Sequence, residues 1–174
     1  MPELKAISKE AVAAALEKAE RYRLLNEPRE SESICRDALR TSPGHQHALI
    51  TLLLSLTDQF GKGFGVDLRD AREILPQIQG DYEQAYYSGV VLERWGKSRP
   101  EGGAPVDVMH DWLRQAMAYF QQAEEIRPAG NDEAILRWNT CARIIGRRSG
   151  GERPTHPTDG PDGPESFDDE VPIL

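Results

Sequence analysis

The spacing of apolar side chains predicts α-helices along most of the first 148 residues. In the stretch from Gln115 to Pro128, the side chains of Ala116, Phe120 and Ala123 recur at intervals of four and three, which places them on one helical face. Pro128 ends this helix because proline has no amide hydrogen for the next turn. A small, large, small stripe of this kind is typical of two closely packed helices.

A second stretch repeats the pattern. Ser31, Cys35 and Ala38 have the same spacing, and Pro43 follows Ala38 by five residues, as Pro128 follows Ala123. The two copies lie 85 residues apart, which is two periods of 34 residues plus 17 further residues. The chain is therefore expected to contain repeated helix pairs with insertions between them.

The paired pattern resembles the tetratricopeptide repeat, whose second helix carries a small residue, an aromatic residue and a final proline. Tyr22 stands nine residues before Ser31, where the aromatic residue of the first helix is expected, and Gly89 is the small residue expected before Ala116. The resemblance covers residues 8–148. It implies an all-α, right-handed superhelical stack of antiparallel helix pairs, with about three repeats and a capping helix, seven helices in all. It also implies a scaffold or adaptor that binds another protein.

Helix boundaries follow from capping residues, prolines and glycines. Ser8 is expected to cap the first helix and Asp67 the fourth, while Pro76 should kink or end the fourth. Loops are expected at residues 59–66 and 96–105, where glycine is frequent. The seven expected helices cover residues 8–25, 28–42, 48–57, 67–78, 81–95, 105–126 and 131–147.

The repeat register predicts two close contacts between helices. Gly89 should pack on Ala116, and Ala19 on Ser31. The position equivalent to Gly89 in the last helix is Trp138, whose size excludes a tight partner helix. We therefore expect the seventh helix to cap the stack.

Charge divides the chain into two parts. The sequence has 29 acidic and 21 basic residues, but residues 149–174 hold seven of the acids and one arginine, so the body is nearly neutral. A near-neutral body argues against wrapping nucleic acid, which favours a basic face. We predict a helical domain at residues 8–148 and a disordered acidic tail, rich in proline and glycine, at residues 149–174.

Cysteine usage and hydropathy favour the cytoplasm. Cys35 and Cys141 both fall on predicted apolar helix faces, as expected of small buried side chains in a reducing compartment. The N-terminal segment lacks a signal-peptide pattern, and the longest apolar run, residues 48–56, is too short to cross a bilayer.

First helices of stacked pairs usually line a concave groove, so the register predicts a binding surface. Its middle is apolar and its flanks mostly acidic, which favours a peptide with apolar anchors and some basic character. The alternative is that neighbouring helices bury part of this stripe. A lysine and asparagine clamp for a terminal carboxylate is not expected, because only Asn139 and two arginines stand at suitable positions. The predicted groove residues are Leu16, Glu20, Arg23, His47, Ile50, Leu54, Thr57, Glu83, Tyr86, Val90, Glu93, Asp132, Ile135, Asn139 and Arg143.

No pattern of catalytic, cofactor-binding or metal-binding residues is apparent, so we expect neither an enzyme nor a cofactor. His45 and His47 are two residues apart and point away from each other on a helix, which favours capping or solvated roles. The His110-Asp111 dipeptide resembles that of metal phosphohydrolases, but the other ligands are absent. The GKGFG segment at residues 61–65 lacks the ending of a phosphate-binding loop.

The last eight residues, FDDEVPIL, return to an apolar pattern beside acids. They resemble the acidic tip of bacterial single-stranded DNA-binding proteins, although that tip ends in phenylalanine where this chain has Ile173-Leu174. The resemblance implies docking on basic pockets of DNA-repair or replication proteins, and the alternative is a solubilising tail. The residues of the motif are Phe167, Asp168, Asp169, Glu170, Val171, Pro172, Ile173 and Leu174.

Two further surfaces stay open to interpretation. Trp138, Ile145 and the VPIL segment could contact a second copy, which would make the protein a self-associating scaffold. Arginines gather near the last helix, where cations suit the helix dipole, and nucleic-acid binding is not expected there. These arginines are Arg137, Arg143, Arg147 and Arg148.

Overall fold

The structure is a computed structural model that describes residues 3–98 and 106–149. In those ranges the protein is helical and has no β-strand, which confirms the predicted all-α class. The predicted tail and Pro105 lie outside the described residues. The elements are η1 (Lys9–Ala11), α1 (Val12–Leu24), α2 (Pro28–Thr41), α3 (Gln46–Thr57), α4 (Leu68–Ile74), η2 (Leu75–Gln77), α5 (Asp81–Ser98), α6 (Val106–Glu125) and α7 (Glu133–Ser149).

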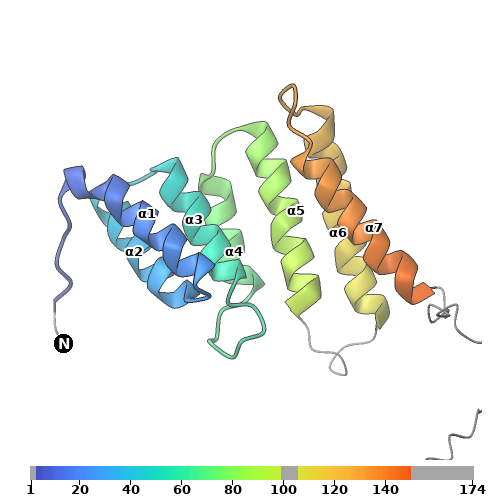
Figure 1. Cartoon of the computed structure of the whole chain (residues 1–174), viewed down its shortest axis with the longest axis horizontal. Coiled ribbons are helices and arrows are strands. Elements are labelled where there is room, and N and C mark those ends of the chain that lie inside the picture. Colours follow the sequence, from blue (N-terminus) through green and yellow to red (C-terminus); the bar gives the residue numbers. More distant parts are fainter. Residues whose placement is uncertain (1–2, 99–105, 150–174) are drawn as a thin grey trace, which may run out of the picture.

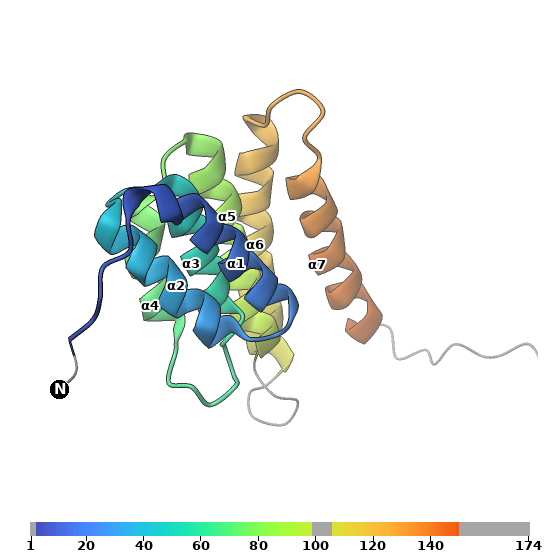
Figure 2. The same cartoon turned by 60° about the vertical axis from the view of Figure 1, so that its left-hand side comes forward.

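The helices lie side by side in two layers. In Figure 1, α1, α3, α5 and α7 form the front layer, and α2, α4 and α6 lie behind them. Successive helices run antiparallel, and the turned view in Figure 2 shows the same order. Most contacts between helices join chain neighbours, most extensively α5 and α6. The right-handed superhelical winding implied by the tetratricopeptide resemblance stays a prediction.

Local signals place several helix ends as expected. Asp67 forms a capping box with Asp70: the Asp67 carboxylate accepts from the Arg69 amide at 2.7 Å, and the Asp67 amide donates to Asp70 Oδ2 at 2.7 Å. The helix ends at Ile74, and Pro76 lies in the 3-10 turn η2, which confirms the predicted break.

Other helix ends differ from the prediction. The Ser8 side chain makes no capping hydrogen bond, so the predicted Ser8 cap is wrong, and a 3-10 turn precedes α1. Helix α3 begins at Gln46, two residues before the predicted start, because the ring of His45 caps the helix by accepting from the Ala48 amide at 3.4 Å. This contact confirms a capping role for His45.

The predicted loop at residues 96–105 begins too early, because α5 continues through Gly96 to Ser98. Gly96 is buried, and a β-carbon there would lie 2.9 Å from Trp112 Cβ of α6. Gly89 lies two turns before Gly96 in α5 and faces the ring of Phe120 in α6. Phe120 is one turn beyond Ala116, the predicted partner of Gly89. Two glycines seven residues apart thus let α5 and α6 approach closely.

The core consists of two clusters that meet around Leu39, Val66 and Ile74. The first cluster gathers around Phe120 and joins α3 to α7, and the second lies between α1, α2 and α3. Ala19 and Ser31 are both fully buried, as their predicted packing requires. Phe120, the large member of the predicted stripe, has no exposed surface.

The connection between α3 and α4 contains Gly61, Gly63 and Gly65, all with positive φ. A side chain at Gly61 would clash with the Ser98 carbonyl oxygen, whereas Gly63 and Gly65 face open space. Lys62, which follows Gly61, donates from Nζ to Asn26 Oδ1 at 2.7 Å. The loop is therefore held at its base against the ends of α1 and α5.

Candidate interaction surfaces

Five of the fifteen predicted groove residues are buried. For these five the predicted partner contact is wrong, and the alternative, that neighbouring helices bury part of the stripe, holds. Neighbouring helices cover these side chains: each front helix packs against a back helix, α1 packs on α3, α3 packs on α5, and Arg137 of α7 reaches α5. Leu16 belongs to the core cluster of α1 to α3, and Val90 to that of α3 to α7. The buried members of the predicted set are Leu16, Thr57, Tyr86, Val90 and Glu93.

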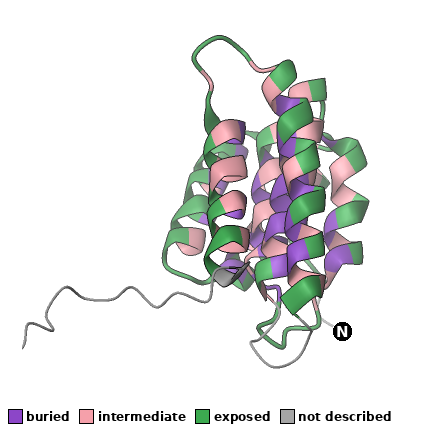
Figure 3. Ribbon diagram, turned by 90° about the vertical axis from the view of Figure 1, so that its right-hand side faces the viewer, coloured by how far each residue is buried: buried purple, intermediate pink, exposed green. Residues whose placement is uncertain are grey.

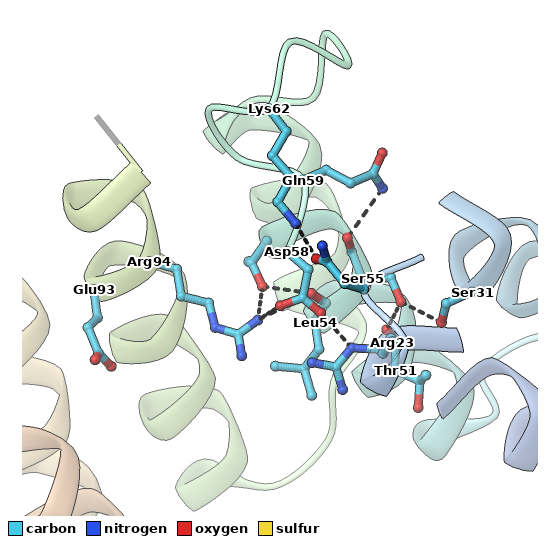
Figure 4. Close-up of polar contacts among 12 residues, drawn as sticks. Arg23, Ser31, Thr51, Leu54, Ser55, Asp58, Gln59, Lys62, Glu93 and Arg94 are labelled. Carbon is cyan, nitrogen blue, oxygen red and sulfur yellow. Dashed lines mark hydrogen bonds and ion pairs between the residues drawn. The ribbon is translucent and has the colours of Figure 1, made fainter. Parts of the chain in front are cut away.

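Asp58, the residue that follows α3, ties three front helices together (Figure 4). Arg23 of α1 donates to Asp58 Oδ2 at 2.8 Å, and Arg94 of α5 donates to Asp58 Oδ1 at 2.6 Å. Arg94 also donates to Thr57 Oγ1 at 2.7 Å and to the Leu54 carbonyl at 3.3 Å. Burial lowers the pKa of the Arg94 guanidinium, and Asp58 opposes that shift. The predicted groove residue Arg23 is therefore held in an internal bridge.

Glu93 forms the corresponding bridge between α5 and α7. Its carboxylate is 2% exposed and accepts from Lys97 and, at 2.8 Å, from Arg137. Arg137 also donates to the Tyr86 hydroxyl at 3.0 Å. Burial lowers the pKa of Arg137, but the hydrogen bonds with Tyr86 and Glu93 outweigh it and raise the pKa above its ordinary value. Glu93 is thus neutralised internally and does not face a basic partner.

Exposed groove residues are few and partly paired. His47 Nε2 lies 2.6 Å from Glu20 Oε1, and each side chain is about half exposed. Ile50, Leu54 and Glu83 are half-buried. The apolar residues Ile50 and Leu54 in the middle of the predicted groove are therefore only partly accessible.

The predicted groove residues of helix α7 do not face α5. Ile135 and Asn139 line a recess of about 370 Å³ together with Trp138 and residues of α6, whereas the contact with α5 is made by Arg137, which was not among the predicted groove residues. Ile135 and Asn139 therefore belong to the open end of the row, away from α5. Asp132 and Arg143 are exposed. The α6 residues of this recess are Gln121 and Glu124.

A larger recess, missed by the sequence analysis, lies between α2 and α4. It has a volume of about 520 Å³ and an apolar lining from α2, α3 and α4, with Leu4 of the N-terminal segment at its edge. The available signal was Pro76, which ends α4 early and leaves α2 without a full-length neighbour in the back layer. The lining residues are Leu4, Ser33, Arg36, Asp37, Leu39, Arg40, Leu49, Leu52, Ile74 and Gln77.

The cysteines occupy the interior, as predicted. Cys35 and Cys141 are free thiols without exposed surface, and burial raises the pKa of each to about 11. A thiol with this pKa is a poor nucleophile at neutral pH. His110 is also buried, and His156 lies outside the described residues.

Within the described ranges, no group of three or more histidine, cysteine or acidic side chains is arranged to hold a metal ion. No described helix combines the length and apolar character that crossing a membrane requires. Comparisons with models of protein families, with curated proteins and with solved structures found no match for this chain.

Proposed function

We propose that this protein is a non-enzymatic interaction scaffold of the tetratricopeptide type that holds an apolar segment of a partner protein in the recess between α2 and α4. The observation that carries the proposal is the recess itself, whose volume of about 520 Å³ falls within the range of about 300–1,000 Å³ typical of binding pockets. The cytoplasm is the proposed compartment, and no cofactor is required.

The lining of the recess indicates the chemistry of the partner. Leu39 and Ile74 are half-buried and form the accessible apolar surface of the recess, and the core residues Leu49 and Leu52 lie beneath them with 1% of their surface exposed. Such a surface suits one or two aliphatic or aromatic side chains. At the rim, Arg40 pairs with Asp37 at 3.6 Å, and both side chains are more than a third exposed. A rim of both signs orients a polar flank of the partner and contributes little affinity.

The ion pairs of the front layer support a scaffold role. The Asp58 and Glu93 bridges join α1, α3, α5 and α7 through partly or fully buried charges. A framework held in one arrangement before binding loses less conformational entropy when the partner arrives. The front layer thus fixes the spacing of the helices behind it.

The proposed site differs from the predicted groove in its position and its partner. A basic peptide was expected because of Glu83 and Glu93, but Glu93 is already paired with Lys97 and Arg137. An apolar segment fits the α2–α4 recess without needing a basic flank. Docking of residues 167–174 on DNA-repair proteins, and self-association through Trp138 or Ile145, stay predictions.

Peptide selection followed by measured affinity tests the proposal. Random displayed peptides are selected on immobilised full-length protein, and a selected sequence is synthesised with a fluorophore for polarisation measurements. Leu4→Ser removes an exposed leucine from the edge of the recess and should weaken binding about fivefold to thirtyfold, as expected for about 1–2 kcal/mol of lost apolar contact.

Leu24→Ser is the matched control. Leu24 is 88% exposed and Leu4 is 74% exposed, but Leu24 does not line the recess, so its replacement should leave the affinity unchanged. Selected peptides that bind Leu4→Ser and wild-type protein equally would contradict the proposed site. Failure to select any peptide with apolar anchors would contradict it as well.

A further inference from the structure

Within the described residues, no helix other than α5 and α6 covers α7, so the outer part of this last helix is open. Figure 3 views this end of the molecule, where much of α7 is exposed or intermediate. Leu136 is 64% exposed, and Ile135, Trp138 and Asn139 line the recess of about 370 Å³ between α7 and α6. Ile135 and Trp138 supply the apolar part of this recess, and Leu136 adds an exposed aliphatic side chain on the same helix, so a short aliphatic group finds apolar contacts here.

Charge along α7 gives this surface a direction. Arg143 and Arg147, toward the C-terminal end of α7, are exposed, and neither forms an ion pair with another described residue. Acidic residues lie toward the other end: Glu124 lines the recess, and Glu133 opens α7. An acidic group is therefore attracted to the arginine end of α7, and Ile135 and Trp138 at the recess end offer contact to an apolar group.

The segment at residues 167–174 also has a charged part followed by an apolar part. Phe167 is followed by three acids, Asp168 to Glu170, and then by Val171, Pro172, Ile173 and Leu174. We propose that this segment docks on its own chain along α7, with its acids beside Arg143 and Arg147 and its aliphatic side chains in the Ile135–Trp138 recess.

The dimensions of the two parts agree. Eight helical residues separate Arg143 from Ile135, a rise of about 12 Å. An extended segment from Asp169 to Ile173 spans about 13 Å. One segment running antiparallel to α7 can thus place a carboxylate beside Arg143 while an aliphatic side chain reaches Ile135. The reverse orientation would bring the acids of the segment toward Glu133, a like charge at the start of α7.

The connecting residues allow this contact within one chain. Residues 150–166 form a 17-residue link from the end of α7 to Phe167, rich in glycine and proline. Such a link spans roughly 23 Å as a glycine-rich coil and up to about 53 Å as an extended polyproline helix. Both lengths exceed the distance of one or two helical turns that docking requires. The local concentration of the segment is then on the order of millimolar, so even weak contacts are populated.

Paramagnetic relaxation in the full-length protein tests this docking. Ser166→Cys introduces one reactive thiol for a nitroxide label, because Cys35 and Cys141 are buried with pKa values of about 11. We expect broadening of the Trp138 indole signal and of amide signals from Ile135 to Arg147, and no broadening in α1. The effect should weaken in about 0.5 M salt, because exposed charges are then screened.

Charge reversal separates specific docking from general attraction. Arg143→Glu with Arg147→Glu should reduce the paramagnetic relaxation of α7 at least about fivefold, and adding Asp168→Lys with Asp169→Lys should restore it. Arg21→Glu with Arg69→Glu is the matched control, because both arginines are exposed and lie outside α7, so broadening should persist.

A mixed sample distinguishes docking within one chain from docking between two copies. It combines nitroxide-labelled chains that lack ¹⁵N with ¹⁵N-labelled chains that lack the nitroxide, so that any broadening arises between copies. Little broadening in the mixture supports docking within one chain, whereas equal broadening shows contact between copies and overturns the proposal. Absence of broadening on α7, or broadening that survives reversal of Arg143 and Arg147, overturns it too. None of these results bears on the α2–α4 recess, so the two proposals can fail separately.

Discussion

Gly89 of α5 lies directly against the ring of Phe120 in α6, and a β-carbon at Gly89 would come within 2.5 Å of Phe120 Cε1. Phe120 has no exposed surface and belongs to the core cluster that joins α3 to α7. The ring therefore has little freedom to move, and the distance between α5 and α6 depends on the absence of a side chain at Gly89.

Gly89→Ala should destabilise the fold by about 1–3 kcal/mol, because the added methyl group overpacks a filled core. Urea unfolding followed by circular dichroism measures the change. Gly146→Ala in α7 is the matched control: apart from its own helix, nothing in the described part of the chain lies within 4 Å of its β-carbon position, so alanine should stabilise the protein by about 0.5–1 kcal/mol. Equal effects of the two substitutions would contradict the close packing at Gly89.

Asp58→Asn should cost about 1–3 kcal/mol, because Arg23 and Arg94 lose the carboxylate that both contact. The Asp58 and Arg94 side chains are each 25% exposed, so solvent screens this pair only partly. Asp111→Asn breaks the Arg114 pair, in which both side chains are more than half exposed, and should cost no more than about 0.5 kcal/mol. Urea unfolding of both variants decides between a structural bridge and a surface pair.

Asp67→Ala should destabilise the protein by about 1 kcal/mol through loss of the cap that begins α4. Glu73→Ala, an exposed position in the same helix, serves as the control and should change stability by less than about 0.5 kcal/mol. Hydrogen exchange of the α4 amides should accelerate in Asp67→Ala and not in Glu73→Ala. Unchanged exchange in both variants would show that the capping box contributes little.

Stability should fall as the pH rises from 9 to 11. Burial raises the pKa of Cys35 and Cys141 from 9.0 to about 11, so the unfolded chain releases these protons first. The contribution of each thiol is complete below pH 9 and is lost toward pH 11, by up to about 2–3 kcal/mol per thiol. Urea unfolding across this range should show a smaller decline for Cys35→Ala with Cys141→Ala. Burial raises the pKa of Tyr87 to about 12, which affects both proteins equally.

The sequence predicted the elements with local signals best. Pro76 and Asp67 act within a few residues of their own position, so the end and the start of α4 followed from chain chemistry alone. Gly96 was assigned to a loop because glycine usually interrupts helices. Its role depends instead on Trp112, a residue of the next helix that becomes its neighbour only after folding.

The buried members of the predicted groove were misassigned for a similar reason. Glu93 and Tyr86 were assigned to a partner surface, but α7 covers them through Arg137. Helical periodicity specifies which residues share a face, whereas the rotation of each helix depends on packing from other elements. The recess between α2 and α4 exists because α4 is short. None of the residues that line the recess indicates this by its own identity in the sequence.

The glycine loop between α3 and α4 offers a position for protein engineering. Gly61 is constrained by the Ser98 carbonyl, but Gly63 and Gly65 have open space around them and lie next to exposed Phe64. An insertion between Gly63 and Phe64 would extend the chain into solvent and leave the anchored base in place. A fluorescent reporter or an affinity tag inserted there would leave the contacts of Gly61 and Lys62 with Ser98 and Asn26 intact.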